Sequence, residues 1–192
     1  MASGDQTQRP GRTSDEELYR RMRKGDANAF AALYERHEPP LYGYALHMTG
    51  SSVIAEEIAH DVFMTLMAPG SGFDERRGTL DVYLFGITRN LVRAARRKGP
   101  VEEAVDQAIE YDILGDLINN ETMALLRRAL KQMPQGYRDA VVLCDLEELP
   151  YEEAAKLMGC PVGTVRSRLH RARALLAAKL KSVNKRSEVS AR

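Results

Sequence analysis

The stretch "GCPVGTVRSRLHRAR", residues 159–173, combines a tight turn with a strongly basic segment. Gly159, Cys160 and Pro161 interrupt a helical pattern, and the residues that follow include arginines and a histidine but no acid. A short helical pattern, Tyr151–Met158, precedes the turn. A short helix, a turn containing glycine and a longer basic helix form the helix-turn-helix layout. The stretch therefore predicts a domain that binds duplex DNA.

The second helix of this motif separates into two faces. Its apolar residues recur at i, i+4, i+7 and i+11 and are expected to pack on Ala154, Ala155 and Met158 of the first helix: Val165, Leu169, Ala172 and Leu176. The N-terminal part of the other face meets base edges in this motif, and arginine bonds guanine in bidentate fashion. The predicted major-groove residues are Gly163, Thr164, Arg166, Ser167, His170 and Arg171. A basic face that meets only solvent is the alternative.

Charges along the chain fall into blocks of one sign. Every charged residue from 84 to 98 is basic, every one from 99 to 121 is acidic, and every one from 154 to 186 is basic again. Solvated helices usually mix the two signs, so the blocks indicate two surfaces that bind polyanions, joined by an acidic connector. The net charge of +1 would not have indicated this.

Composition excludes several other classes of protein. No apolar run approaches the roughly 20 residues of a membrane span, and the first residues lack a secretory signal, so a cytoplasmic protein is expected. The two cysteines, Cys144 and Cys160, are too far apart for a CxxC motif, and the four histidines form no ligand pattern. We expect no metal, no cofactor and no catalytic residue.

Helical signals dominate, and no series of strands is evident. The fold class expected is all-α, with two small helical domains joined by an acidic linker and the helix-turn-helix in the second. The expected segments are a disordered tail (1–13), a first domain (14–98), the linker (99–120), a second domain (121–181) and a tail (182–192). Helices are expected at 14–24, from 28 to a break at Pro39-Pro40, and at 41–49, 52–67, 79–98, 121–132, 136–145, 151–158 and 162–181, with a loop at 68–78.

The residues resemble a known family at two places. "YEEAAKLMGCPVGTVRSRLHRAR" (151–173) is similar to the promoter-binding domain of extracytoplasmic function (ECF, group IV) sigma factors of bacterial RNA polymerase. "AFAALYERH", "AEEIAHDVF", "FDERRGTLDVYLFGITRN" and "RAARR", within residues 29–97, resemble the N-terminal domain of that family in order and spacing. Tyr83 departs from the family pattern, which usually has tryptophan there.

The resemblance implies roles for further residues. The helix at 79–98 and the loop before it would capture the melted strand of the −10 element, through Tyr83, Arg89, Asn90, Arg93, Arg96 and Arg97. The helix at 52–67 would bind core RNA polymerase, through Glu56, Glu57, His60, Asp61 and Phe63. The final helix would bind the −35 element. The implied partners are core RNA polymerase (its β′ coiled coil and β flap), promoter DNA and an anti-sigma factor, without membrane insertion.

Two other functions remain possible from the residues. A helix-turn-helix regulator that acts as a dimer without polymerase would explain residues 121–181, but it would give no role to the basic helix at 79–98. A DNA-processing enzyme would need a nucleophile or a second acidic motif, and Glu56, Glu57 and Asp61 have none near them in the sequence. Specific initiation that requires core polymerase would distinguish the sigma factor from both.

Overall fold

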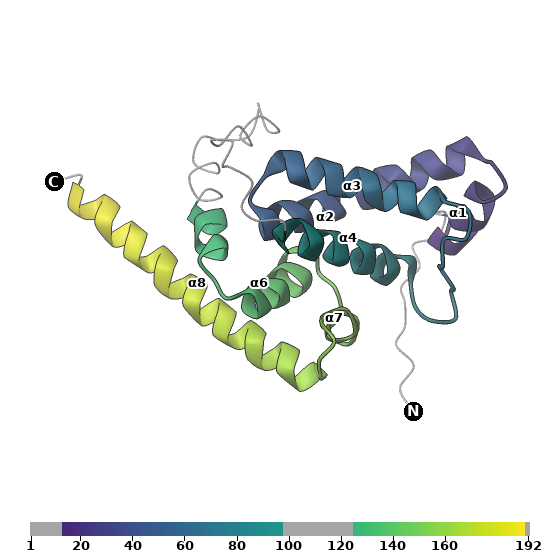
Figure 1. The fold of residues 1–192 in the computed structure, drawn as a ribbon. Helices are drawn as coiled ribbons and strands as arrows, with labels where there is room; N and C mark the ends of the chain where they lie inside the picture. Colours follow the sequence, from purple (N-terminus) through teal and green to yellow (C-terminus); the bar gives the residue numbers. More distant parts are fainter. Residues whose placement is uncertain (1–12, 98–124, 191–192) are drawn as a thin grey trace.

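The computed structural model describes residues 13–97 and 125–190, and these residues are helical with no strand among them. They form two small helical domains, as the all-α prediction requires (Figure 1). The predicted acidic linker, 99–120, lies outside the described residues. The helices of the first domain are α1 (Asp15–Met22), α2 (Ala27–Thr49), α3 (Ser52–Met67) and α4 (Leu80–Arg97). Those of the second are residues 125–131, α6 (Gln135–Val141), the π-helical turn η1 (Val142–Leu146), α7 (Tyr151–Met158) and α8 (Val162–Ser190).

Side-chain caps begin the first three helices. Ser14 accepts a hydrogen bond from the Glu17 amide, as the capping-box pattern predicted. Asp26 caps α2, and Ser51 caps α3 by accepting from the amide of Ile54. Each cap satisfies backbone donors that have no partner within the helix, which fixes where the helix begins.

Helix α2 runs through Pro39 and Pro40 without interruption. The prediction of a break at this pair was wrong. A proline inside a helix costs about 3 kcal/mol, because it removes a backbone donor and clashes with the preceding turn. Leu33 and Leu41, on either side of the pair, are both fully buried in the same core. The packing of both halves of α2 therefore outweighs the local cost.

The second domain departs from the predicted helices in two places. The helix expected at 136–145 is α6 followed by the wider turn of η1, which buries Val142 and Leu143. Helix α8 continues past the expected end at Lys181 to Ser190. The turn before α8 matches the prediction, since Gly159 ends α7 in the left-handed conformation that favours glycine.

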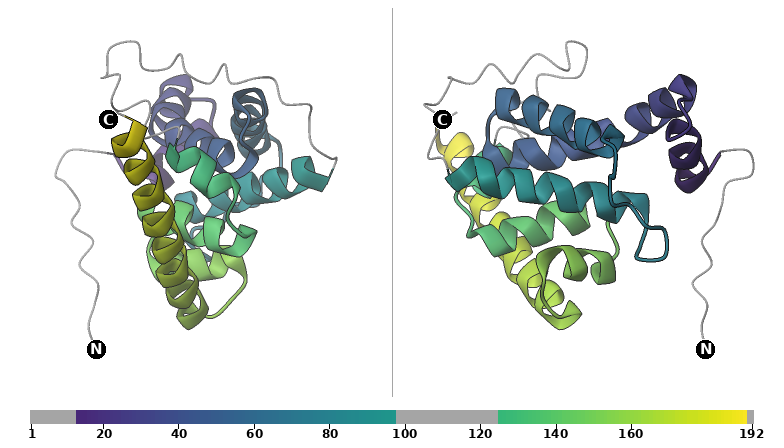
Figure 2. Two further views of the ribbon diagram at one scale, coloured as in Figure 1. Left: turned by 90° about the vertical axis from the view of Figure 1, so that its left-hand side faces the viewer. Right: turned by 45° about the vertical axis from the view of Figure 1, so that its right-hand side comes forward.

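The two domains pack directly on each other. Helix α7 contacts α4, and η1 contacts α2, while α8 lies along the outer edge of the second domain (Figures 1 and 2). Two glycines of the first domain allow close approach. A Cβ on Gly86 would lie 3.7 Å from Leu157, and one on Gly43 would lie 3.1 Å from Oε1 of Glu147. One continuous apolar core therefore spans both domains.

Candidate nucleic-acid interface

The helix-turn-helix is held together by the apolar faces that its sequence predicts. Ala154, Ala155 and Met158 of α7 are buried, and Val165 and Leu169 of α8 are buried with them. Small residues on α7 let the two helices approach closely. This packing turns the opposite face of α8 toward solvent.

The exposed face of α8 carries the predicted base-reading residues. Gly163, Arg166, Ser167, His170 and Arg171 are exposed, and their i, i+3, i+4, i+7, i+8 spacing places them on one side of the helix. Thr164 is half-buried beside them. A single helix can enter a major groove, and the arginines of this face are the residue type that pairs with guanine there.

Contacts of α8 with neighbouring side chains divide its arginines into two groups. Arg173 forms a bidentate ion pair with Asp145 at 2.6 and 2.9 Å, and Arg168 packs on Gly136. These two arginines therefore fasten α8 to η1 and α6. Arg166 lies over the ring of Tyr151, with its guanidinium carbon 5.9 Å from the ring centroid, and remains exposed. Arg171 is also exposed and donates to the hydroxyl of Tyr137 at 3.4 Å. Arg173 is exposed as well, so the ion pair of Arg173, and not exposure, separates it from Arg166 and Arg171, the two arginines expected to read bases.

The basic residues of α4 do not all face solvent. Asn90, Arg93, Arg96 and Arg97 are exposed, whereas Arg89 is buried at the contact between the domains. Nη2 of Arg89 lies 3.0 Å from Oδ2 of Asp139, and Nη1 donates to the carbonyl oxygen of Leu157 at 2.7 Å. In this arrangement Arg89 binds the second domain and is withdrawn from the exposed basic surface.

Asp139 is the centre of a buried polar cluster between the domains. Its carboxylate also accepts a hydrogen bond from the hydroxyl of Tyr44 at 2.9 Å. Burial, and next the charge of Asp139, raise the pKa of Tyr44 well above its ordinary value, so the hydroxyl keeps its proton. Beside it, Arg138 donates to the carbonyl oxygen of Met48 at 3.1 Å. Arg89 and Asp139 thus neutralise each other across the boundary between the domains, whereas Arg138 is held by carbonyl oxygens and Nε of each arginine is buried without a hydrogen-bond partner among the described residues.

The loop at 68–78 is held by side chains from both of its neighbours. The hydroxyl of Tyr83, on α4, accepts a hydrogen bond from the amide of Gly72 at 3.1 Å, and its ring packs on Phe73. The hydroxyl of Tyr19, on α1, lies 2.8 Å from Oγ of Ser71. Tyr83 is half-buried by these contacts.

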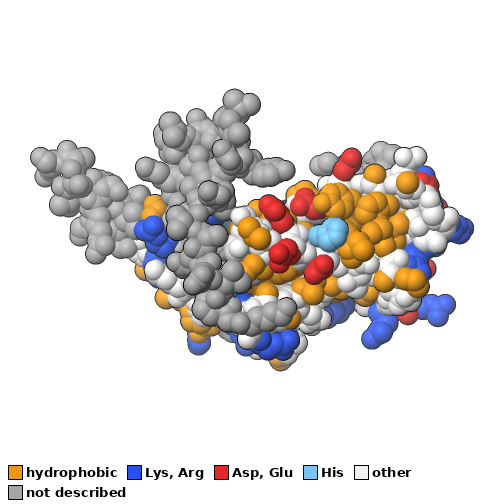
Figure 3. All heavy atoms as spheres, turned by 45° about the horizontal axis from the view of Figure 1, so that its top comes forward, with side chains coloured by type: hydrophobic (Ala, Val, Ile, Leu, Met, Phe, Trp, Pro, Cys, Tyr) orange, Lys and Arg blue, Asp and Glu red, His pale blue; other side chains and the backbone are white. Residues whose placement is uncertain are grey.

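Helix α3 presents an acidic face. Glu56, Glu57, His60 and Asp61 are exposed, and Figure 3 shows acidic side chains gathered around a histidine beside an apolar area. Burial, and then the charge of Glu56, raise the pKa of Glu38 on α2, so Glu38 lies close enough to this face to be affected by it. Phe63 points the other way. It is 2% exposed and packs edge-on against Phe30, so it supports α3 from inside the core.

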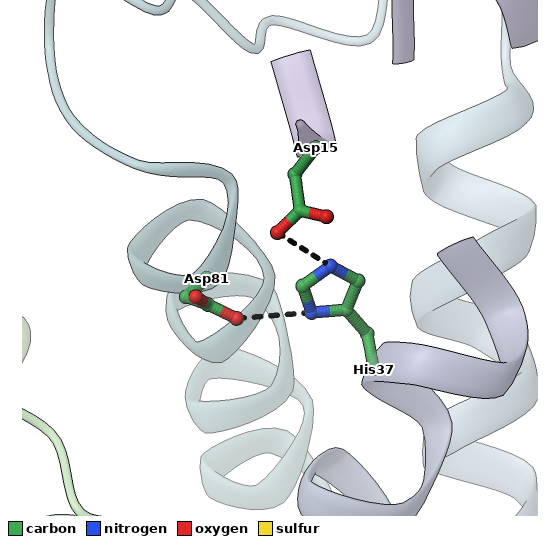
Figure 4. Close-up of side chains that lie close together, drawn as sticks. All are labelled: Asp15, His37 and Asp81. Atoms are coloured by element: carbon green, nitrogen blue, oxygen red, sulfur yellow. Dashed lines mark ion pairs between the residues drawn. The ribbon is translucent and has the colours of Figure 1, made fainter. Parts of the chain in front are cut away.

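The buried His37 of α2 joins α1 and α4 through a carboxylate on each (Figure 4). Nδ1 of His37 lies 2.9 Å from the carboxylate of Asp81, and Nε2 lies 3.2 Å from that of Asp15. Burial opposes the charged ring, but the two carboxylates outweigh it and raise the pKa of His37 to about 9. Arg36 also pairs with Asp15. Each carboxylate faces a different ring nitrogen, so an imidazolium, rather than one shared metal ion, suits this cluster.

Comparisons with known proteins decide the family. The models of sigma-70 region 2 and sigma-70 region 4 match residues 33–99 and 123–176. The chain is 30% identical over 191 residues to the ECF RNA polymerase sigma-E factor of Salmonella typhimurium, and the match covers 90% of this chain and 97% of the relative. This chain belongs to the ECF RNA polymerase sigma factors.

Two further proteins are similar to this sigma factor. The ECF RNA polymerase sigma factor SigE of Mycolicibacterium smegmatis is 33% identical over 149 residues, and the match covers 73% of this chain but 57% of that relative. A solved structure of the sigma factor RpoE in complex with the anti-sigma factor NepR, from Bartonella quintana, has a TM-score of 0.66 at 26% identity. That likeness covers 79% of this chain and 96% of the other.

As an alternative sigma factor, the protein binds core RNA polymerase, recognises promoter elements and promotes the initiation of transcription. Sigma factors are initiation factors and not enzymes. Among the described residues, no helix combines the length and apolar character needed to cross a membrane.

Sequence reasoning missed the residues that join the two domains of this sigma factor. Tyr44, Arg138 and Asp139 carry the buried polar cluster, and none of them was a predicted site residue. No local signal identifies them, because arginine and aspartate are mostly exposed and are buried only when they find a partner elsewhere in the chain.

Proposed function

We propose that this sigma factor uses three separate surfaces, one for each partner that initiation requires. The observation that carries the proposal is their arrangement on one chain. Helix α3 presents exposed acids, while α4 and α8 each present exposed cations. Two cationic surfaces on different domains suit two elements of one promoter, which a single helix-turn-helix would not need.

The α8 surface is proposed to bind the −35 element as duplex. Arg166, Ser167, His170 and Arg171 would contact base edges, with Gly163 and Thr164 near a phosphate at the N-terminus of α8. Asn90, Arg93, Arg96 and Arg97 of α4, with the loop at 68–78, are proposed to hold the melted −10 strand. Arg89 would join them only when Asp139 releases it.

The α3 surface is proposed to bind the β′ coiled coil of core polymerase. Glu56, Glu57 and Asp61 would face basic residues there, and His60 lies among them. We also propose that the second domain contacts the β flap of core polymerase. The same proposal places the protein in group IV and its action at the nucleoid in the cytoplasm. An anti-sigma factor is a proposed partner, because the similar sigma factor from Bartonella quintana is bound to one.

Transcription in vitro tests the proposal. The full chain is added to core RNA polymerase with a pool of DNA templates randomised over the −35 and −10 positions, and the transcribed templates are sequenced. We expect enrichment of two separated motifs, with core and chain both required. Tight binding of a palindrome by the chain without core would instead support a stand-alone regulator.

The α3 surface is tested separately by reversal of charge. The variant Glu57→Lys should bind core polymerase more weakly, and the difference should shrink as salt is added, because exposed charges are screened. Glu35→Lys, which makes a similar change at an exposed position of α2, is the matched control. Equal binding by both variants would exclude the α3 surface.

A further inference from the structure

Helix α1 lies outside both segments that match the sigma-70 models, yet it holds the loop at 68–78. The matched segments begin at residues 33 and 123, and α1 spans Asp15–Met22. The hydroxyl of Tyr19 lies 2.8 Å from Oγ of Ser71, and its ring packs edge-on against Phe73 with centroids 5.0 Å apart. Arg23, which ends α1, donates to the carbonyl oxygen of Ala68 at 2.9 Å. Helix α1 thus contacts the loop at its beginning and in its middle.

Tyr83 of α4 contacts the same loop as Tyr19. Its hydroxyl accepts the hydrogen bond from the amide of Gly72, one residue after Ser71, and its ring lies 5.6 Å from that of Phe73. Phe73 is therefore placed between two tyrosine rings, and two adjacent loop residues are each fixed by one tyrosine hydroxyl. Both contacts use the hydroxyl group, which phenylalanine lacks.

The hydrogen bonds within the loop join Ser71 to Ala68 and Arg76 and Arg77 to Asp74, so they fix its two ends better than its middle. Gly70 adopts φ +84°, and a Cβ at Gly70 or Gly72 would meet no atom within 4 Å. Glycine has the largest freedom to lose on ordering, so contacts from outside must hold it. The residues that follow, Asp74 to Arg77, are exposed and free to meet a ligand.

The helices that supply the two tyrosines are themselves tied together. Asp15 stands at the first position of α1 and Asp81 in the first turn of α4, and His37 bridges the two (Figure 4). An ion cluster outside the loop, centred on the buried His37, therefore joins the two helices that carry Tyr19 and Tyr83. The loop is therefore attached to two helices, α1 and α4, that are joined independently of it.

We propose that Tyr19 and Tyr83 are positioning residues that hold residues 71–73 in one shape and thereby set the base preference at the −10 element. The inference rests on the proposed function of the loop and α4. Under this inference, Tyr83 acts by positioning the loop and not by contacting DNA itself. Helix α1, which carries Tyr19, then contributes to promoter selection.

The test compares Tyr19→Phe and Tyr83→Phe with Tyr34→Phe in the full chain. Tyr34 is a half-exposed tyrosine of α2 whose hydroxyl makes no hydrogen bond within the described part of the chain. Transcription with core polymerase on templates randomised at −10 and −35 gives the base preference of each variant. We expect the first two variants to lose about three- to tenfold of the preference at one or more −10 positions, the effect of one hydrogen bond. Preference at −35 should not change, and Tyr34→Phe should match the wild type.

Hydrogen exchange gives a second readout that does not depend on transcription. The amide of Gly72 should exchange faster in Tyr83→Phe than in wild type or in Tyr34→Phe. Unchanged exchange, unchanged −10 preference, or an equal loss at −10 and −35 would overturn the proposal. If the wild type shows no initiation with core, the proposed function fails. The exchange rates then still decide whether the tyrosine hydroxyls hold the loop.

Discussion

The guanidinium of Arg89 lies 3.0 Å from the carboxylate of Asp139, and this ion pair joins the two domains where both side chains are buried. Arg89 belongs to the basic block that predicts strand binding, and Asp139 belongs to the second domain. The contact with the melted strand that we propose for Arg89 would therefore require this ion pair to open. The basic surface that α4 exposes in this structure lacks Arg89.

Replacement of Asp139 by alanine should lower the free energy of unfolding by about 3–5 kcal/mol, because it leaves the guanidinium of Arg89 buried without its counter-ion. Urea denaturation of the full chain measures the loss. Asp145→Ala is the control, since it removes the partner of the exposed Arg173, and its effect should be far smaller. Similar losses in the two variants would contradict a buried, energetically important pair.

Replacement of Arg166 by alanine should reduce discrimination at one −35 position by about 1–3 kcal/mol if its guanidinium reads a base. Transcription with core polymerase on −35 variants measures this discrimination. Arg173→Ala serves as the comparison, because Arg173 is engaged by Asp145 on the side of α8 that faces η1. If transcription fell by the same factor on all −35 sequences, Arg166 would instead contact a phosphate.

The stability of the first domain should depend on pH through His37. Its folded-state pKa of about 9 lies above its ordinary value of 6.5, so the stabilisation is fully present below pH 6.5 and is lost as pH rises through 9. The loss approaches about 3 kcal/mol. His37→Gln should remove this dependence, whereas His60→Gln, at an exposed position, should retain it. Denaturation at pH 6, 7.5 and 9.5 checks the prediction, and parallel curves for wild type and His37→Gln would refute it.

The carboxyl of Glu147 should make the free energy of unfolding depend on pH in a second, lower range. Burial against α2 raises the pKa of this carboxyl from 4.5 to about 7. Stability contributed by the protonated form is present below pH 4.5 and falls as pH rises through 7. Glu147→Gln should therefore gain stability relative to wild type over that range and keep a constant advantage above it. Urea midpoints at pH 5, 6, 7 and 8 measure the difference, with Glu148→Gln as control. A difference that does not vary with pH would contradict the assignment.

Local sequence signals located most of the helix boundaries. Ser14, Ser51 and Gly159 each carry a cap whose chemistry is local, so the structure agrees with the predicted boundary. The break predicted at Pro39-Pro40 failed because a local cost was weighed without the core on both sides of the pair. The turn η1 was missed because a π-helical turn has the same apolar pattern as a regular helix.

The separation of site residues into exposed and buried ones required the fold. Arg89 and Arg93 share a helix and a residue type, and only the packing of α6 and α7 against α4 makes one buried and the other exposed. Phe63 stands among the acids of α3 in the sequence, but the helix turns it into the core. Tyr83 is predicted to contact the melted −10 strand, and only the fold shows that its hydroxyl accepts a hydrogen bond from the amide of Gly72.

The sequence by itself determined the fold class, the helix-turn-helix and the two cationic blocks, because these depend on periodicity, caps and charge within a few residues of one another. The tertiary structure decided which charges remain free and which loop residues are held. Those outcomes depend on contacts between residues far apart in the chain, such as Arg89 with Asp139 and Tyr19 with Ser71. No local pattern records such contacts, since each partner alone is compatible with many surroundings.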